Sequence, residues 1–184
     1  MKTTFLMIAR ILYEKGYYEY VEAAKIIHKN YSKVDFLLLG NIDKTHPDAV
    51  PEAIIHADHE AGHITYLGYR SDVRQIIYKS DCIVLPSYYN EGLSRVLMEG
   101  LAMRKPLITT NMPGCKETVD DGINGFICQP RNIQSLTYCF QKFLALKPEN
   151  RKEMGERGRE KAENQFDIKE VIKVYESITK KYLK

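Results

Sequence analysis

Short, continuously apolar runs that alternate with segments of helical periodicity are the feature that most constrains how this chain folds. These runs lie at residues 3–9, 34–39, 63–67, 82–85, 106–110 and 126–128. A strand buried on both faces is apolar along its whole length, as the strands of parallel sheets are. Strands that alternate with helices predict a parallel sheet with right-handed crossovers. We therefore expect an α/β fold: a Rossmann-like, doubly wound parallel sheet of about six strands with helices on both faces.

The segments between the runs carry the expected helices. Their predicted ranges are 17–30, 47–58, 72–79 and 93–103, followed by helical sequence from residue 132 to the end. Pro47 is well placed to open the second helix, because proline is favoured in the first helical turn. Gly62 is expected to end that helix, since glycine is the usual terminator. Residues 149–165 are charged and predict a surface helix, and residues 168–182 predict a terminal amphipathic helix.

Composition excludes several classes of protein. The chain has 184 residues, 44% of them hydrophobic and 28% charged, which fits one soluble domain, residues 1–184. A net charge of +3 is too small to argue for a nucleic-acid partner. Neither a membrane span nor a signal peptide is visible. The four cysteines form no Cys-x-x-Cys pair, and Cys82 and Cys139 fall on apolar faces, so buried thiols in the cytoplasm are expected.

The carboxyl ends of the first and fourth strands are the expected ligand site. In a doubly wound sheet of order 3-2-1-4-5-6 these strands are neighbours where the order reverses, and ligands bind outside that point. Arg10 and Lys15 follow the first strand, and the loop 87–92 follows the fourth. The next helix begins near Gly92-Leu93-Ser94, and a helix amino terminus attracts anions. Two cations facing that terminus predict a phosphate or diphosphate ligand.

Two acids, one in this loop and one in the helix after it, lie where packing does not require them. Glu91 precedes the helix and Glu99 follows eight residues later, about two turns along. The segment 91–99, EGLSRVLME, resembles the E-x7-E element of retaining GT-B glycosyltransferases of family 4. Other segments resemble further motifs of that family in the same order: ARI with KG at 9–16, YLG at 66–68, AMRKP at 102–106, PGCKE at 113–117 and DGINGF at 121–126. The similarity is greatest to bacterial enzymes that build capsule, O-antigen or lipid-linked oligosaccharides from UDP-sugars.

The resemblance implies a role for each matching position. Arg10 and Lys15 would hold the donor diphosphate and stabilise the leaving group, and together with Glu91 they would form the catalytic set. Glu91 would contact hydroxyl groups of the transferred sugar, near the backbone N–H groups of Gly92 and Leu93. The remaining positions divide between the other parts of the donor: Ser94 and Arg95 by the phosphates, Glu99 on the ribose, and the backbone of Gly68 and Tyr69 by the base. Transfer would retain the anomeric configuration and need no metal or other cofactor.

Some features depart from the family. Ala9 and Arg104 stand where glycine is common. A complete enzyme of this kind is about twice as long, because an amino-terminal domain contacts the acceptor. The chain is therefore expected to be the carboxyl-terminal donor-binding domain alone, half of a GT-B fold and inactive in isolation. Its other partners would be that missing acceptor domain and a lipid-linked glycan at the inner face of the bacterial membrane.

Other interpretations remain open. His59-Glu60-Ala61-Gly62-His63 satisfies the H-E-x-x-H signature of zinc hydrolases, which needs both histidines on one helix face. Gly62 argues against that helix. A nucleotide-binding module without transfer activity is the other alternative. Tyr88 and Tyr89 fit loop packing as well as a sugar platform, and the lysines near the carboxyl terminus fit a solvated face.

Overall fold

A computed structural model of the chain describes residues 2–90 and 92–182. Its centre is a six-stranded sheet in which every neighbouring pair is parallel, in the order β3-β2-β1-β4-β5-β6. The strands are β1 (Thr3–Ile8), β2 (Val34–Leu39), β3 (Thr65–Tyr66), β4 (Cys82–Leu85), β5 (Leu107–Thr110) and β6 (Gly125–Cys128). The predicted fold class and the predicted strand order are both confirmed, and β1 and β4 are neighbours at the reversal point.

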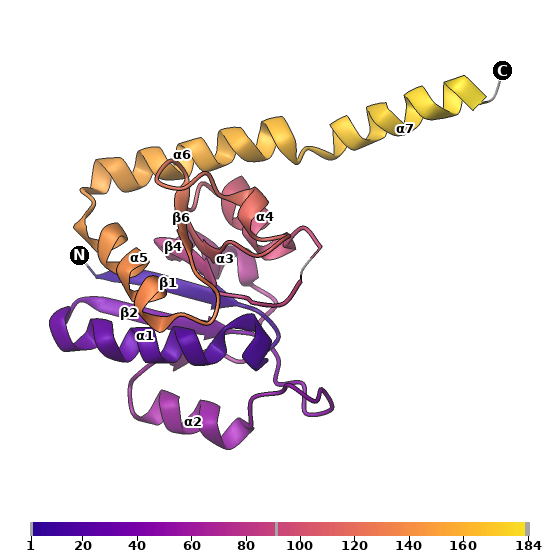
Figure 1. Ribbon diagram of the computed structural model, residues 1–184. Helices are drawn as coiled ribbons and strands as arrows, with labels where there is room; N and C mark the ends of the chain where they lie inside the picture. Colours follow the sequence, from indigo (N-terminus) through magenta and orange to yellow (C-terminus); the bar gives the residue numbers. More distant parts are fainter. Residues whose placement is uncertain (1, 91, 183–184) are drawn as a thin grey trace.

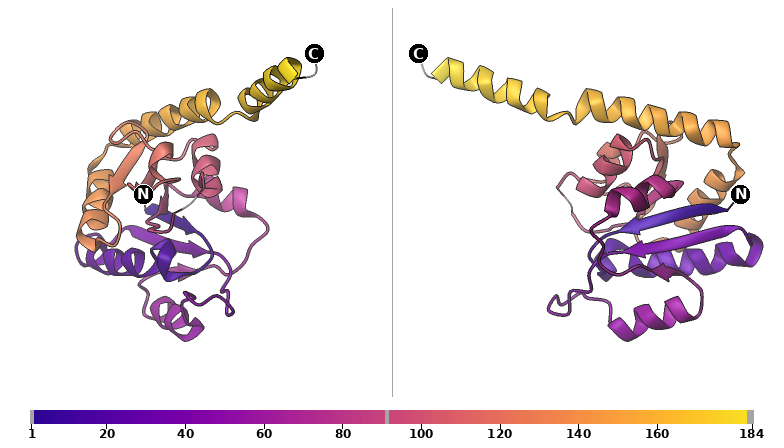
Figure 2. Two further views of the ribbon diagram at one scale, coloured as in Figure 1. Left: turned by 45° about the vertical axis from the view of Figure 1, so that its right-hand side comes forward. Right: turned by 180° about the vertical axis from the view of Figure 1, so that it is seen from behind.

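Helices cover both faces of this sheet (Figures 1 and 2). They are α1 (Tyr17–Asn30), α2 (Glu52–Glu60), α3 (Val73–Lys79), α4 (Arg95–Ala102), α5 (Ile133–Ala145), α6 (Pro148–Gln165) and α7 (Ile168–Tyr182), with short 3-10 helices η1 (Tyr13–Lys15) and η2 (Lys116–Thr118). Helices α1, α2 and α5 bury their apolar side chains against one face. Helices α3 and α4 pack on the other, and α6 contributes Met154 to the first cluster and Ala162 to the second.

Aromatic rings fill the core on the α1 side. The Phe5 ring lies 5.2 Å from that of Phe36 and 4.6 Å from that of Phe140, centroid to centroid. Tyr20 is fully buried beside them, and its hydroxyl donates hydrogen bonds to the carbonyl oxygens of Phe5 (3.1 Å) and Leu37 (3.0 Å). A buried tyrosine hydroxyl needs such partners, because an unpaired one would lose its hydration without compensation.

On the opposite face, α4 lies very close to the sheet. A Cβ atom added at Gly100 would lie 2.9 Å from the Leu107 side chain and 3.1 Å from that of Ile83. Leu97 and Leu101, on the same side of α4, are fully buried. The close contact fixes the helix, and with it the position of the amino terminus of α4 relative to β4.

Two predicted elements differ from the structure. The second helix begins at Glu52 and not at Pro47, because residues 43–50 turn back onto the β1 loop: the Asp48 carboxylate accepts the Glu14 N–H at 2.6 Å, and Ala49 pairs with Leu12. The third strand contains only Thr65–Tyr66, because the backbone N–H of His63 turns back to the carbonyl oxygen of Asp58.

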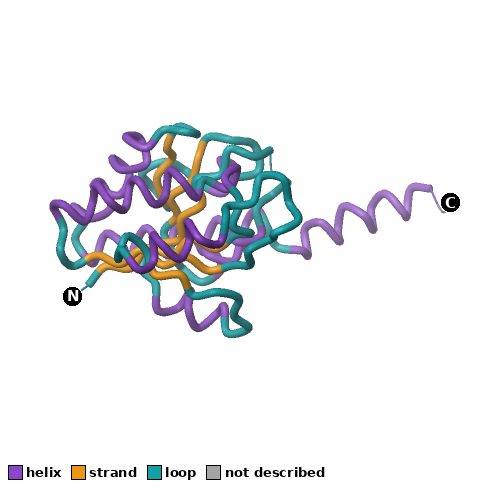
Figure 3. The backbone as a smooth tube through the Cα atoms, turned by 90° about the horizontal axis from the view of Figure 1, so that it is seen from below, coloured by secondary structure: helices purple, strands orange, loops and turns teal. Residues whose placement is uncertain are grey.

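Helix α7 extends away from the rest of the molecule (Figures 1–3). Its large apolar side chains are exposed: Ile168, Ile172, Val174, Tyr175, Ile178 and Tyr182. The prediction of a terminal helix over these residues is confirmed. Within residues 2–90 and 92–182, no helix is long and apolar enough to cross a membrane.

All four cysteines are buried. Burial raises the pKa of the Cys139 thiol to about 11, and it also raises the pKa values of Cys82 and Cys128. The expectation of buried thiols at Cys82 and Cys139 is confirmed, and Cys115 and Cys128 are buried as well.

Candidate functional site

The segments that follow β1 and β4 are joined by direct backbone contacts. Gly16 has φ 85°, and a Cβ atom there would lie 2.3 Å from the carbonyl oxygen of Pro86. The Tyr88 N–H donates to the carbonyl oxygen of Glu14 at 2.9 Å, and the Ser87 hydroxyl donates to the same oxygen at 3.2 Å. These contacts hold η1 beside the loop after β4, and they place Lys15 at the carboxyl end of both strands.

A cavity of about 300 Å³ opens where these segments meet the start of α4. Five of the predicted site residues line it: Arg10, Lys15, Leu93, Ser94 and Arg95. Its floor comes from apolar residues at the ends of β1 and β4, including Ile8 and Leu85. The structure therefore brings three cationic side chains to the switch point, in line with the predicted convergence of Arg10 and Lys15.

The cations at this cavity have different surroundings. Lys15 is only 8% exposed, and its Nζ atom lies 4.6 Å from the centre of the Tyr89 ring, in cation–π geometry. Arg10 is half-exposed, and its guanidinium lies 3.6 Å from the Asp43 carboxylate. Hydrogen bonds from Thr45 hold the pKa of Asp43 below its usual value. Asp43 therefore stays charged and offers Arg10 a partner that a bound anion would have to replace.

The amino terminus of α4 has donors available for an anion. Ser94 is the N-cap residue, but its hydroxyl does not cap the helix, and its own N–H donates to the carbonyl oxygen of Gly114 at 3.0 Å. Among the described residues, no side chain accepts a hydrogen bond from the N–H groups of the first helical turn, residues 95–97. Such unpaired N–H groups and the helix dipole favour a negative charge at this position.

Glu99 lies one turn further along α4 and is exposed. It does not line the cavity that contains Lys15. Instead it lines two neighbouring hollows, one of about 380 Å³ between α4 and α6 and one of about 860 Å³ between α3 and α4. Arg95 lines both the first cavity and the 380 Å³ hollow, so it connects the two regions. Glu91 lies outside the described residues.

Three further predicted positions lie outside these cavities. Gly68 has φ 68°, and its carbonyl oxygen already accepts the Gly40 N–H at 3.1 Å. Tyr69 is 74% exposed. Gly92 is exposed, and a Cβ atom added there would meet nothing within 4 Å.

Some residues that shape the site were not predicted from the sequence. Asp43 and Gly114 contact the predicted residues directly, and Tyr89, for which the sequence left loop packing and a sugar platform open, lies against Lys15. Asp43 could have been predicted, because it follows β2, whose carboxyl end lies beside that of β1. The contact with Gly114 could not, because it joins the loop after β5 to α4.

The H-E-x-x-H segment does not form the helix that a zinc site of this type requires. Helix α2 ends at Glu60, and Gly62 follows with φ 72°. The Tyr66 N–H lies 3.4 Å from the Nδ1 atom of His59, whereas the His63 ring lies 3.1 Å from Asp58. No group of three His, Cys, Asp or Glu side chains within the described ranges could hold a metal ion. The two histidines therefore do not share a helix face.

Comparison with known proteins identifies the family. The model of the family described as "Glycosyl transferases group 1" matches residues 1–161. Over 136 residues the chain is 32% identical to N,N'-diacetylbacillosaminyl-diphospho-undecaprenol alpha-1,3-N-acetylgalactosaminyltransferase of Campylobacter jejuni, covering 74% of this chain and 34% of the relative. It is 25% identical over 177 residues to the capsular polysaccharide biosynthesis glycosyltransferase CapM of Staphylococcus aureus, covering 96% and 46%.

The fold also matches a solved structure. Anabaena HepE in complex with UDP superposes with a TM-score of 0.85 at 20% identity, covering 97% of this chain and 49% of HepE. The chain thus spans half or less of the length of these relatives. The sheet order, the match over residues 1–161 and the curated relatives agree, and the chain belongs to the group 1 glycosyl transferases.

Proposed function

We propose that this chain binds the nucleotide-diphosphate sugar donor, a UDP-sugar, for a retaining glycosyltransferase. The observation that carries the proposal is the cavity at the ends of β1 and β4, where Arg10 and Lys15 meet the uncapped start of α4, which also carries Arg95. A diphosphate matches this arrangement, because its charge would be met by both side-chain cations and backbone donors. UDP is the nucleotide bound in the HepE structure, which supports the choice of base.

The donor would lie along α4 from its first turn toward Glu99. The diphosphate would occupy the cavity beside Ser94 and Arg95, with Lys15 and Arg10 stabilising negative charge on the departing β-phosphate and the N–H groups of residues 95–97 holding its oxygens. From there Arg95 connects to the hollow lined by Glu99, which would accept hydrogen bonds from the ribose. Tyr69, exposed after β3, would lie beside the base together with the Gly68 backbone. Glu91, with the backbone N–H groups of Gly92 and Leu93, would contact the sugar.

The remaining parts of the proposal concern the whole enzyme. The Campylobacter and Staphylococcus relatives are named for a lipid-linked glycan and a capsular polysaccharide, so we propose an acceptor of that class. The acceptor would be held by a second domain, since this chain spans half or less of those relatives. Transfer would keep the anomeric configuration, require no metal and take place in the cytoplasm at the inner face of the membrane.

Calorimetric titration with UDP, GDP and ADP tests the proposal. We expect UDP to bind most tightly, with a Kd between millimolar and micromolar. Replacing Arg10 or Glu99 with alanine should weaken binding by roughly tenfold or more, because each removes a charged hydrogen-bond partner worth about 1.5–3 kcal/mol. Lys29→Ala is a matched control, because Lys29 is exposed at the far end of α1.

Two results would decide against parts of this function. If no nucleotide binds and the protein is folded, the site assignment is wrong. If UDP binds but the chain, mixed with an acceptor-binding domain, transfers sugar from no donor, the alternative of a nucleotide-binding module without transfer activity is favoured.

A further inference from the structure

A second hollow, of about 400 Å³, lies at the end of the sheet opposite the proposed donor site. It opens beside the amino-terminal ends of β1, β4 and β5, because it includes Thr3, Asp81 and Pro106. Five cations line it against one acid: Lys2, Arg104, Lys105, Arg151 and Lys152, with Asp81. We call this site the basic pocket.

Two of these cations have carboxylate partners. Lys2 lies 2.6 Å from Asp35, and Arg104 lies 2.7 Å from Glu156. Among the described residues, no carboxylate lies within 4 Å of the nitrogen atoms of Lys105, Arg151 or Lys152. The pocket therefore holds more positive charge than its own acids neutralise.

Two of the three cations without a carboxylate partner are held in place by neutral acceptors. The Lys105 ammonium donates to the carbonyl oxygens of Tyr78 and Ser80, both at 2.7 Å. Burial lowers the pKa of Lys105 despite the opposing charge of Asp81, and a further anion beside the ammonium group would offset more of that cost. The site is preorganised, because these bonds fix the ammonium group without neutralising it.

Arg151 is fixed in the same way. Its guanidinium donates to the hydroxyl of Thr3 and to the carbonyl oxygen of Leu144, both at 2.9 Å, and it lies over the Phe143 ring. Its Nε atom is buried without an acceptor. The Asp81 carboxylate accepts the Thr4 N–H at 2.7 Å. The single acid of the pocket is thus already engaged by the backbone of β1.

The backbone adds to the positive field. Helix α6 begins at the rim with Pro148, and the side chain of its N-cap residue, Lys147, makes no cap hydrogen bond. The positive end of its dipole therefore faces the same hollow. Arg104 has φ 56°, a left-handed conformation that glycine would adopt without strain. A Cβ atom at Gly155 would lie 2.2 Å from the Arg104 carbonyl oxygen, so α6 packs directly on this strained turn.

We propose that the basic pocket binds a phosphate group. Phosphate carries up to two negative charges and oxygen acceptors on every side, which matches Lys105, Lys152 and the start of α6 converging on one hollow. The phosphate could belong to a soluble phosphorylated molecule or to an anionic lipid headgroup. The site is separate from the proposed donor cavity, so it does not depend on the proposed function.

Titration of the ¹⁵N-labelled full chain with inorganic phosphate, with UDP also present, tests this proposal. We expect saturable shifts in the amide signals of Ser80, Lys105 and Lys152, distinct from any shifts at Ala9 or Ser94. Lys152→Gln and Lys105→Gln should each raise the Kd for phosphate by roughly three- to tenfold, since each removes a charge-assisted contact. Lys152 is exposed, so its replacement should leave the fold intact.

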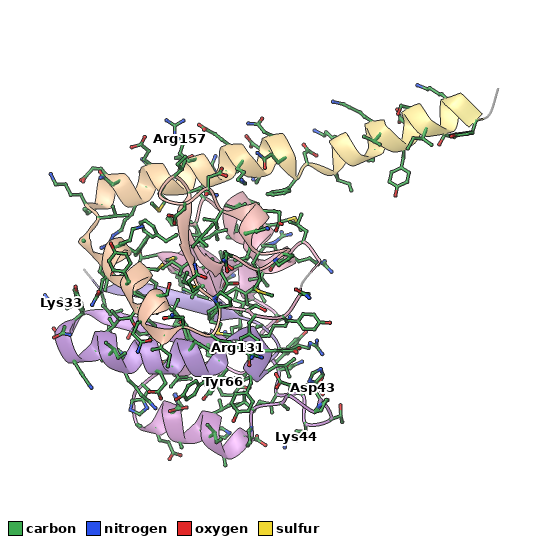
Figure 4. The ribbon with its side chains drawn as sticks, viewed as in Figure 1. Lys33, Asp43, Lys44, Tyr66, Arg131 and Arg157 are labelled. Atoms are coloured by element: carbon green, nitrogen blue, oxygen red, sulfur yellow. The ribbon has the colours of Figure 1, made fainter. Side chains whose placement is uncertain are left out.

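Arg157→Gln is the matched control. Arg157 lies on α6, as Lys152 does, but it pairs with Glu153 and Glu160, and Figure 4 shows it pointing away from the body of the protein. Its substitution should not change the Kd. Equal weakening in Arg157→Gln and Lys152→Gln would show diffuse attraction and overturn the proposal. Absence of saturable shifts at the pocket, or shifts confined to the donor cavity, would also overturn it.

Vesicle sedimentation distinguishes the two sources of the phosphate group. Vesicles of phosphatidylcholine are compared with vesicles that also contain phosphatidylglycerol. Binding only to the anionic vesicles, reduced in Lys152→Gln but not in Arg157→Gln, identifies a headgroup. Saturable phosphate shifts without vesicle binding identify a soluble phosphorylated ligand. Vesicle binding unaffected by Lys152→Gln, together with no phosphate shifts, contradicts a site in this pocket.

Discussion

Gly16 shows how a single residue sets the geometry of the candidate site. Its φ of 85° and the distance of 2.3 Å from an added Cβ atom to the Pro86 carbonyl oxygen leave no room for a side chain. Lys15 precedes it directly, so any movement here shifts the Lys15 ammonium relative to α4. A side chain at position 16 is therefore disfavoured both by the left-handed backbone conformation and by the contact with Pro86.

We expect Gly16→Ala to lower the free energy of unfolding by clearly more than the roughly 1–2 kcal/mol of the left-handed backbone cost alone. The matched control is Gly62→Ala, because Gly62 has φ 72° but nothing within 4 Å of an added Cβ atom. Urea denaturation measures both variants. Equal losses in the two would mean that the contact with Pro86 is not restrictive.

Glu19 is a buried acid whose charge opposes folding. It is 8% exposed, one of its carboxylate oxygens has no hydrogen-bond partner, and burial raises its pKa, a shift only partly opposed by its backbone N–H and by Arg131. Because the folded-state pKa lies above the unfolded one, this group makes stability fall as pH rises between the two values. Below the unfolded pKa the carboxyl is neutral in both states, and the penalty disappears.

Glu19→Gln should therefore stabilise the protein by about 1 kcal/mol at pH 7, the scale of an unsatisfied buried group, and by much less near pH 4. Glu22→Gln, on the same helix, is the control, because Glu22 is paired with Lys25 at 2.8 Å. Denaturation at several pH values gives the comparison. A gain from Glu19→Gln that does not change with pH would contradict the charge argument.

At the scale of elements, α7 contributes little to the core. Its apolar side chains are exposed, whereas Phe166, just before it, packs against the α4 side of the sheet. Deleting residues 168–184 should change the free energy of unfolding by less than about 0.5 kcal/mol, as expected for exposed positions. Phe166→Ala should cost about 1–3 kcal/mol, somewhat less than a fully buried ring. Thermal unfolding of both variants checks this. A large loss of stability on deletion would show that α7 packs against the rest of the protein in solution.

Element order was predictable from the sequence, but some element boundaries were not. The apolar runs identified six strands, and general topology rules for α/β proteins placed β1 beside β4. The start of α2 was missed because Pro47 sits in a turn held by Asp48 and Ala49 through contacts with the β1 loop. Those contacts join residues more than 30 positions apart, so local hydrophobic periodicity cannot predict them. The proline that does precede the helix is Pro51.

At the scale of the whole molecule, the two ends of the parallel sheet have separate chemistry. Arg10 and Lys15 were predictable as neighbours of α4 because strand topology alone brings them there. The burial of Lys15 beside the Tyr89 ring depends on side-chain packing and was not predictable. The basic pocket gathers residues near positions 2, 81, 105 and 151, and no motif in the sequence marks that grouping.

Ligand binding should stabilise the whole sheet without a metal. At a UDP concentration 100 times its Kd, the gain is about 2.7 kcal/mol, or several degrees in Tm for a chain of this size. We expect the same shift in EDTA as in Mg²⁺, because Arg10, Lys15 and Arg95 supply the positive charge. Differential scanning fluorimetry makes the comparison, and a shift that vanishes in EDTA would show that the diphosphate needs a cation.

The four buried cysteines can report on local unfolding of the native chain. Cys82 lies in β4, Cys128 in β6 and Cys139 in α5, and burial raises the pKa of each thiol, so few of them are reactive thiolates in the folded protein. An alkylating reagent would modify them only when the surrounding structure opens. The order in which these positions acquire the label would then rank the strands and helices by how often each one opens, with no probe introduced and no residue changed.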